Sequence, residues 1–285
     1  MPRTIENKKM AFKYSITLSS FRNIETLERT LERLVQQGYD AIEMFGEPEN
    51  VDLKSLIDTF HSFDIPLTGI TGMWGSISPN GWKRRFISLE PSIVTSSQKY
   101  VQQCIEMCYS LGGDKVNICL FADDRLVTPD RNHNMISEDQ KAPIVQRTIP
   151  VLSELSVFAK QHGIQLLLEP LNRYSTPYCT TADDAVSIAK QINQDNFGIL
   201  LDTFHMNIEE DSFEQAILKS EGLLQHTHFA DNNRKMPGYG HIDFKSIVNS
   251  LRKIGYNHYI SFEPNLTRKD YKSATKNGLE FIKSI

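Results

Sequence analysis

The chain has 285 residues, of which 40% are hydrophobic and 23% are charged, and this composition is typical of a globular protein. Its formal net charge of −4 gives no general attraction to nucleic acids or anionic membranes, so we expect small-molecule partners. The sequence has no apolar stretch long enough to span a bilayer and no N-terminal apolar block like that of a signal peptide, so we expect a cytoplasmic protein.

Short apolar runs rich in β-branched residues, which are typical of buried strands, recur along the chain. We predict strands in chain order at residues 13–21, 39–46, 65–75, 115–122, 164–172, 197–205, 223–231 and 258–265. Patterns with a period near 3.6 lie between them and predict helices, among them residues 26–37, 92–111, 142–161, 181–192 and 244–254. This alternation is typical of an α/β fold with a parallel sheet.

Glycines separate several predicted helices from the strands that follow them. Gly38, Gly112, Gly163 and Gly255 each stand where a helix needs a left-handed residue at its C-terminal end. The repeated helix, glycine and strand pattern shows no linker and no break in composition. We therefore predict one domain over residues 1–285, folded as a (β/α)8 TIM barrel.

Two of the predicted connections after strands are long, at about residues 75–91 and 123–140. Long loops on the catalytic face of a barrel commonly serve as lids or substrate walls. Trp74 stands at the start of the first loop, where its ring could stack on a sugar face or simply pack in the loop.

Several common functional motifs are missing from the sequence. There is no phosphate-binding P-loop, no dinucleotide-binding glycine motif after a strand and no nucleophile elbow of a serine hydrolase. The four cysteines have no zinc-site spacing, and we expect them to be buried, reduced thiols.

Four residues that can bind metal each end a short apolar run of strand character late in the chain: Glu169, Asp202, His228 and Glu263. In a barrel, the C-terminal ends of the strands open at one mouth, so these side chains should converge. Three close carboxylates repel one another unless a cation compensates them. One nitrogen with three carboxylates suits a divalent ion such as Mn²⁺, Mg²⁺, Co²⁺ or Zn²⁺ better than a soft, thiophilic ion.

Two of the candidate ligands also have a plainer interpretation. Glu169 could form a surface salt bridge, although three leucines before it indicate a buried strand. Asp202 could cap a helix. His226 faces the same side as His228 because strand side chains alternate, but it lies deeper, as a core histidine or one that supports a ligand.

Three further residues are candidates for substrate contacts. His205 follows Asp202 closely, and it is either a hydrogen-bond donor to a substrate oxygen or a packed histidine. Glu43 ends a strand and could bind substrate or form an ion pair. Arg234 lies in a loop, where it is either solvated or a clamp on substrate oxygens.

Glu169 and Glu263 share a glutamate–proline strand end. Two glutamates on opposite sides of a bound substrate could remove a proton from one face of a carbon and return it on the other. We therefore predict that these two residues are catalytic as well as metal ligands.

The sequence resembles the xylose-isomerase-like barrels, and within them the ketose 3-epimerases. The resemblance covers most of the chain and is carried by EPLNR, LDTFHMNIEE, HTHFADNNR and FEP, in this order. It implies the same four metal ligands, often with Mn²⁺, and contacts from His205 and Arg234 to the sugar near its carbonyl. It also implies a cis-enediolate formed by proton transfer at the carbon next to the carbonyl. Barrels of this family are often homodimers or homotetramers.

One position departs from the pattern of these epimerases. They commonly carry an acidic residue shortly after the NR of EPLNR, where it contacts substrate hydroxyls, and this chain has Ser175 there. A shorter, neutral side chain could admit an inosose, a sugar acid or a sugar phosphate. The alternative functions are therefore an inosose isomerase or dehydratase, or a sugar-phosphate or sugar-acid isomerase.

Functions outside sugar isomerisation have less support. An apurinic endonuclease on this barrel would need more histidine and aspartate ligands and a basic face for DNA phosphates. A carbohydrate-binding barrel without activity would not need all four ligand positions. We therefore expect an isomerase that acts on a small sugar or polyol.

Overall fold

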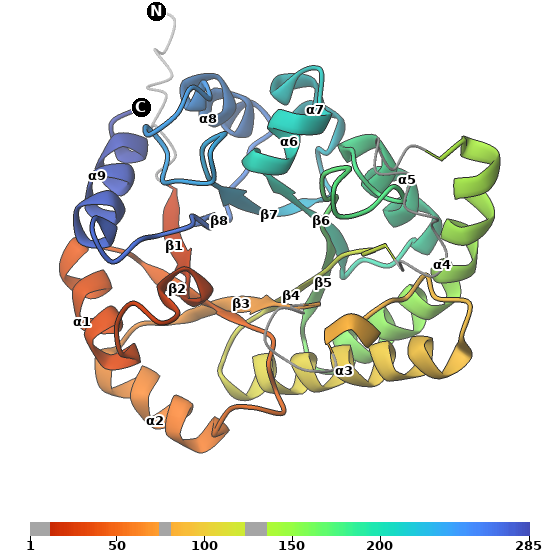
Figure 1. The fold of residues 1–285 in the computed structure, drawn as a ribbon, viewed down its shortest axis with the longest axis horizontal. Helices are drawn as coiled ribbons and strands as arrows, with labels where there is room; N and C mark the ends of the chain where they lie inside the picture. Colours follow the sequence, from red (N-terminus) through yellow and green to blue (C-terminus); the bar gives the residue numbers. More distant parts are fainter. Residues whose placement is uncertain (1–11, 74–80, 123–135) are drawn as a thin grey trace, which may run out of the picture.

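The computed structural model describes residues 12–73, 81–122 and 136–285, which contain a closed barrel of eight parallel strands (Figure 1). The strands are β1 (Lys13–Thr17), β2 (Ala41–Phe45), β3 (Leu67–Thr71), β4 (Lys115–Ile118), β5 (Gln165–Leu168), β6 (Phe197–Asp202), β7 (Leu224–Phe229) and β8 (Tyr259–Phe262). They pair in chain order, and β8 closes the barrel against β1.

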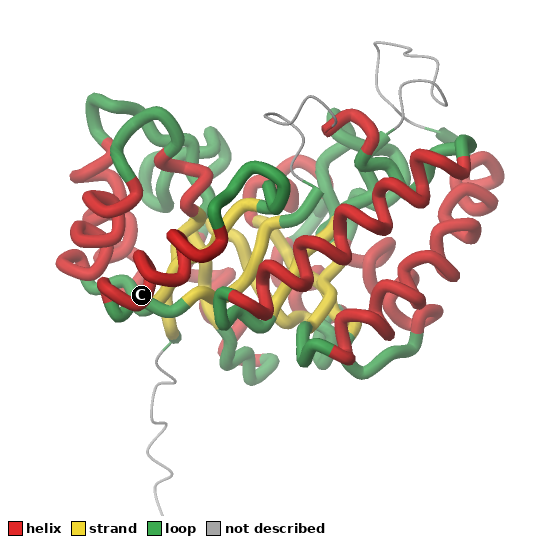
Figure 2. The backbone as a smooth tube through the Cα atoms, turned by 90° about the horizontal axis from the view of Figure 1, so that it is seen from below, coloured by secondary structure: helices red, strands yellow, loops and turns green. Residues whose placement is uncertain are grey.

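Helices surround the barrel, as Figure 1 shows along its axis and Figure 2 from the side. They are α1 (Leu27–Gln37), α2 (Leu53–Phe63), α3 (Pro91–Ser110), α4 (Glu138–Gln161), α5 (Ala182–Ile192), α6 (Thr203–Glu209), α7 (Phe213–Lys219), α8 (Phe244–Lys253) and α9 (Tyr271–Lys283). The predicted (β/α)8 barrel is confirmed. Within the described ranges, no helix combines the length and apolarity that crossing a membrane requires.

The apolar strand residues explain this architecture. The last three residues of β5, all leucines, are buried, because side chains on one face fill the barrel and those on the other contact the helices. The predicted helix ends are also present, since Gly163 and Gly255 both have a φ of +69° after α4 and α8.

Some predicted boundaries differ from the observed ones. The predicted strand at 197–205 ends at Asp202, and the next residue begins α6. The cause is local, since Oδ1 of Asp202 accepts a hydrogen bond of 2.7 Å from the Phe204 N–H and caps the helix. The helix predicted at 142–161 begins earlier, at Glu138, after a capping box formed by Ser137 and Gln140.

The four cysteines are buried and unpaired, as expected. Burial raises the pKa of the Cys104 thiol to about 12, so this thiol is in its neutral form at neutral pH. The cysteines therefore behave as small core residues.

Candidate metal centre and substrate cavity

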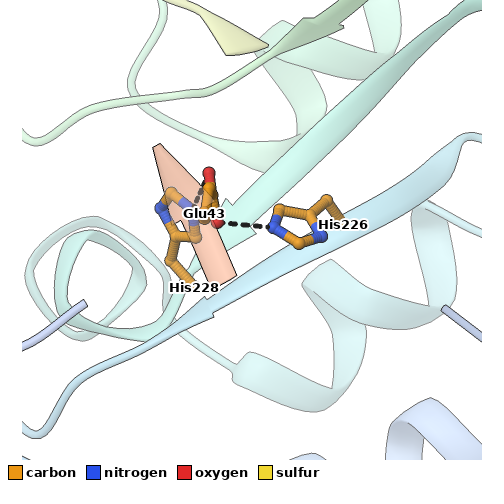
Figure 3. A group of neighbouring side chains, drawn as sticks. All are labelled: Glu43, His226 and His228. Carbon is orange, nitrogen blue, oxygen red and sulfur yellow. Dashed lines mark hydrogen bonds and ion pairs between the residues drawn. The ribbon is translucent and has the colours of Figure 1, made fainter. Parts of the chain in front are cut away.

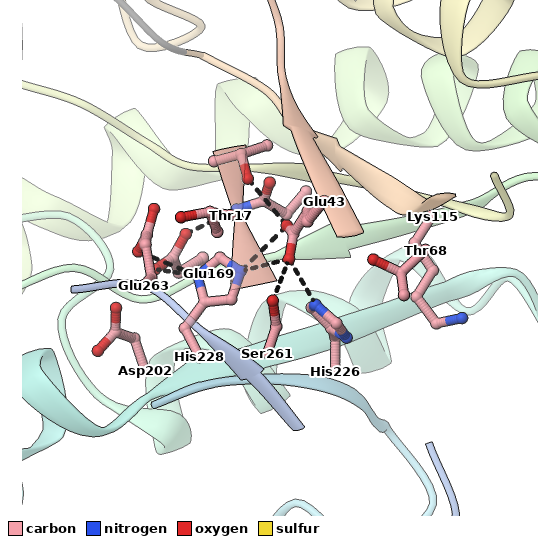
Figure 4. A network of polar contacts seen from close by, with 12 residues as sticks. Thr17, Glu43, Thr68, Lys115, Glu169, Asp202, His226, His228, Ser261 and Glu263 are labelled. Carbon is pink, nitrogen blue, oxygen red and sulfur yellow. Dashed lines mark hydrogen bonds and ion pairs between the residues drawn. The ribbon is translucent and has the colours of Figure 1, made fainter. Parts of the chain in front are cut away.

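Four side chains from neighbouring strands meet at the mouth of the barrel (Figure 4). Glu169 follows β5, Asp202 ends β6, His228 lies near the end of β7 and Glu263 follows β8. Asp202 is the register partner of His228 across β6 and β7. One ligand atom of each residue lies within 4.8 Å of the others. The structure therefore brings together all four residues that the sequence marked as metal ligands.

His228 provides the observation that tests whether a cation fits. Its Nδ1 is buried and has no hydrogen-bond partner among the described residues, although Oε2 of Glu263 lies 3.2 Å away and Oε1 of Glu169 3.9 Å. Its Nε2 lies 3.0 Å from Oε1 of Glu43. Burial lowers the pKa of His228, but Glu43 and Glu263 outweigh it and raise the pKa well above its ordinary value, so in the metal-free protein Nδ1 carries a proton that a cation would displace. With the Nε2 proton donated to Glu43, the lone pair left on Nδ1 would then face the carboxylates. One nitrogen and three carboxylates fit a divalent metal ion.

The two glutamates of this cluster have very different pKa values. Burial raises the pKa of Glu169 to about 8, and the charges of Glu263 and Asp202 add to this effect. Burial also raises the pKa of Glu263, but the positive charges of Arg234 and His228 outweigh this effect and lower its pKa to about 2. Without a bound cation, one glutamate is thus a neutral acid near neutral pH while the other is a carboxylate.

We expect the affinity for divalent ions to fall as the pH drops below about 8. Glu169 is protonated below its pKa of about 8 and must lose that proton to bind a cation, and His228, whose pKa is raised well above its ordinary value by Glu43 and Glu263, must lose one as well. Each pH unit below about 8 should therefore lower the apparent association constant by up to about a hundredfold, the effect of two displaced protons. Isothermal titration of metal-free protein with Mn²⁺, in buffers that differ in ionisation enthalpy, measures both the affinity and the released protons. Equal affinities at about pH 6 and about pH 8 would contradict this expectation.

Glu43 lies beneath His228 and accepts hydrogen bonds from both histidines of β7 (Figure 3). Its oxygens lie 3.0 Å from Nε2 of His226 and 3.0 Å from Nε2 of His228. The hydroxyl of Ser261 donates to the same carboxylate at 2.7 Å (Figure 4). The hydroxyl of Thr71 donates to it at 2.8 Å. Burial opposes its ionisation, but the two histidines lower its pKa well below the ordinary value. Glu43 is thus a fully engaged carboxylate that fixes the ring of His228.

Arg234 closes the other side of the cluster. Its guanidinium donates to Asp202 and to Glu263. The residue has a φ of +58°, in the left-handed region. Arg234 lies in the loop between β7 and α8, which Asp231 stabilises. The Asp231 carboxylate accepts hydrogen bonds from four backbone N–H groups of this loop, those of Asn232, Gly238, Gly240 and Ile242.

A cavity of about 330 Å³ opens beside the cluster. Its walls are Thr71, Gly72, Met73, Arg85, Cys119, Phe121, Glu169, Leu171, His205, Arg234 and Glu263. Four predicted functional residues therefore line one cavity, and two of them are the candidate proton-transfer glutamates. A wider depression of about 790 Å³ between α1 and α9 contains no residue of the cluster.

The other predicted substrate contacts have different positions. Glu43 and Ser175 are not among the residues that line this cavity. Trp74 lies outside the described residues. His205 lies on α6, with its Nε2 3.9 Å from Oε1 of Glu169. Burial lowers the pKa of His205, so its imidazole is neutral at neutral pH.

Two further residues of this region were not predicted from the sequence. Asn117 on β4 donates a hydrogen bond of 2.7 Å from its amide to Oε2 of Glu169. The only indication of its role in the sequence is that a polar side chain stands in an otherwise buried strand. Asp231 lies two residues after the end of β7, but its carboxylate accepts hydrogen bonds from backbone N–H groups and does not belong to the candidate metal cluster.

The chain matches the family model described as "Xylose isomerase-like TIM barrel" over residues 31–285. It is 29% identical to the D-psicose 3-epimerase of Ruminiclostridium cellulolyticum over 82% of this chain and 76% of that protein. It is 27% identical to the 3-dehydro-D-guloside 4-epimerase of Escherichia coli over 90% of this chain and 95% of that protein.

The fold is also similar to solved structures. The D-psicose 3-epimerase of Clostridium cellulolyticum H10, determined with D-tagatose, superposes with a TM-score of 0.79 at 23% identity, covering 96% of this chain and 99% of that one. The curated relatives support an enzyme of the isomerase class that acts as a sugar epimerase. The chain therefore belongs to the xylose isomerase-like TIM barrel family.

Proposed function

We propose that the protein is a metal-dependent epimerase of a ketose or a related polyhydroxy ketone. The observation that carries this proposal is the position of Glu169 and Glu263, which line the same cavity and belong to the same candidate metal cluster. An epimerase that inverts a carbon needs one group to remove a proton and another to return one. The names of the curated relatives support the same reaction type.

In this proposal each glutamate is held by a separate donor. The Asn117 amide orients Glu169, and the guanidinium of Arg234 orients Glu263. One glutamate takes the proton from the carbon next to the carbonyl, and the electron pair of the broken C–H bond moves into an enediolate. The other glutamate takes up a proton from solvent and donates it to the opposite face of that carbon, and the first glutamate returns its proton to solvent, so that both are carboxylates again. Positioning of the two groups supplies much of the rate enhancement.

Glu169, Asp202, His228 and Glu263 would hold the cation, for which we propose Mn²⁺ first and Mg²⁺, Co²⁺ or Zn²⁺ as alternatives. A bound divalent ion would compensate the carboxylates and lower the cost of negative charge on neighbouring substrate oxygens. His205 and Arg234 line the cavity, and we propose that both contact the sugar near its carbonyl.

Two positions of the carbonyl group are compatible with this chemistry. A 2-ketose would react at C3, as the name of the D-psicose relative indicates for that protein. A 3-keto sugar would react at C4, and the match to the 3-dehydro-D-guloside 4-epimerase over 95% of its length favours this as the second candidate. In both cases the reacting carbon is next to the carbonyl, so the same two glutamates suffice.

Incubation of the metal-loaded protein in D₂O with a panel of sugars tests this function. The panel contains 2-ketoses, 3-keto glycosides, inososes, sugar acids and sugar phosphates. We expect one deuterium at the inverted carbon, at C3 of a 2-ketose or C4 of a 3-keto sugar, together with a new epimer. Deuterium at C1, or loss of water, would instead indicate an isomerase or a dehydratase.

Metal analysis of the purified protein is the companion measurement. We expect about one divalent ion per chain, as one four-ligand site binds one ion. A protein that inverts a sugar in the presence of a strong chelator, with no bound metal, would contradict metal dependence.

A further inference from the structure

The hydrogen bonds of His205 determine which of its ring nitrogens carries the proton. Its Nδ1 lies 3.2 Å from the backbone N–H of Asn172 and 2.8 Å from the Nδ2 of the same residue. A backbone N–H can only donate, so Nδ1 must present its lone pair. A neutral imidazole with a lone pair on Nδ1 carries its proton on Nε2.

The orientation of the Asn172 amide is determined in the same way. The backbone N–H of Tyr174 donates to Oδ1 of Asn172 at 3.1 Å, which assigns the oxygen to that side. The NH₂ group therefore faces the ring of His205 and adds a second donor to Nδ1. Asn172 is itself buried, with 5% of its surface exposed, so water does not compete strongly for these groups.

The opposite ring atom faces the proposed reaction site. His205 lines the cavity, and its Nε2 lies 3.9 Å from Oε1 of Glu169, which is beyond hydrogen-bond distance. The N–H of Nε2 is thus close to a proposed proton-transfer group without being bound to it. A substrate oxygen next to Glu169 would meet a hydrogen-bond donor there.

We propose that Asn172 is a positioning residue that holds His205 in the tautomer with its proton on Nε2, so that His205 donates a hydrogen bond to the substrate and does not act as a base. This role rests on the proposed function, whereas the tautomer rests only on the hydrogen bonds of Asn172. A fixed donor stabilises negative charge that develops on a substrate oxygen. It also leaves proton transfer at carbon to the two glutamates.

The tautomer can be measured without any substrate. In protein labelled with ¹⁵N-histidine and loaded with diamagnetic Mg²⁺, we expect the His205 Nδ1 resonance at the position of an unprotonated nitrogen and Nε2 at that of an N–H. Resonances are assigned by comparison with a His205→Gln variant. A proton on Nδ1 would overturn the proposal, whatever reaction the protein catalyses.

The isosteric variant Asn172→Asp tests the positioning role. The new carboxylate still accepts the Tyr174 N–H, but it places an acceptor where the amide donated and so competes with the retained backbone N–H for Nδ1 of His205. The fraction of His205 with a proton on Nδ1 should therefore rise. We expect kcat to fall on the order of 10²-fold, the effect of losing one aligned donor, with a smaller change in KM. The exposed Asn249→Asp is the matched control and should retain the parent rate.

A His205→Gln background separates positioning from general damage. The glutamine amide can donate from near the Nε2 position and has no tautomer, so Asn172→Asp should add less than about threefold in that background. An equal loss in both backgrounds, or a parent-like kcat in the single variant, would overturn the proposal. Failure of the proposed function would look different, because no sugar would then exchange deuterium even with the parent protein.

Discussion

Replacing Glu169 or Glu263 with glutamine should lower kcat/KM for epimerisation by about 10²- to 10⁴-fold or more. An amide cannot accept or return the proton at the reacting carbon, and both residues also belong to the candidate metal cluster. Deuterium exchange and epimer formation are measured together, with the metal content of each variant determined in parallel. Glu221→Gln is the control, since Glu221 is exposed and lies before β7, away from the mouth.

The two variants should also differ from each other. Where a variant retains the metal, its remaining glutamate can still remove the proton from the face that it contacts. Glu169→Gln and Glu263→Gln should therefore each exchange deuterium into one epimer only, and into opposite epimers. If either variant interconverts the epimers at the parent rate, that residue is not a proton-transfer group.

The sequence was a good guide to the barrel because its signals repeat. Each strand of the barrel contains apolar or β-branched residues, and glycines such as Gly163 and Gly255 separate helices from strands at regular places. The limits of the strands were less predictable. The apolar pattern runs on from β6 through Phe204, whereas the capping hydrogen bond of Asp202 begins a helix at Thr203. A single local hydrogen bond therefore decided where His205 lies.

The candidate ligands were visible for a simple geometric reason. In a parallel barrel the last residues of all strands lie at one end, so acidic residues that follow apolar runs converge whatever the details of packing. The structure brings the four together, and their roles in metal binding and catalysis stay predictions.

The same reasoning could not distinguish Glu43, which supports a candidate ligand, from the residues at the mouth of the barrel. Glu43 also closes an apolar run in the sequence, but it is the third residue of β2, and two more strand residues follow it. Glu169, by contrast, comes after the last residue of β5. Glu43 therefore lies deeper in the barrel than the strand-end ligands, where it contacts His226 and His228 of β7. Sequence patterns carry no information about such contacts between distant strands.

Asn117 and Asn172 were missed for a related reason. Both act through one neighbour, Glu169 for the first and His205 for the second. Their importance depends on which atoms lie within hydrogen-bond distance in the folded chain. An amide side chain in a strand or loop gives no such indication by itself.

Replacing Glu43 with alanine should destabilise the metal-free protein by about 3–5 kcal/mol. The carboxylate accepts hydrogen bonds from two buried histidines, and their N–H groups would lose this partner. Affinity for Mn²⁺ should also fall by about 10- to 100-fold, because the ring of His228 would lose the group that orients it. Urea unfolding and metal titration measure the two effects. The exposed Glu49→Ala, in the loop after β2, should change stability by no more than about 0.5 kcal/mol.

Comparison with Glu43→Gln then separates support of His228 from direct substrate binding. Glutamine has nearly the same shape but offers one acceptor oxygen where the carboxylate had two, so it cannot satisfy both histidines and both hydroxyls. If Glu43 supports the metal ligand, metal affinity falls in both variants, and kcat returns toward the parent value when excess Mn²⁺ is added. If Glu43 contacts the sugar instead, KM rises while the affinity for Mn²⁺ stays at the parent value. Since its oxygens already accept four donors beneath His228, we expect the first result.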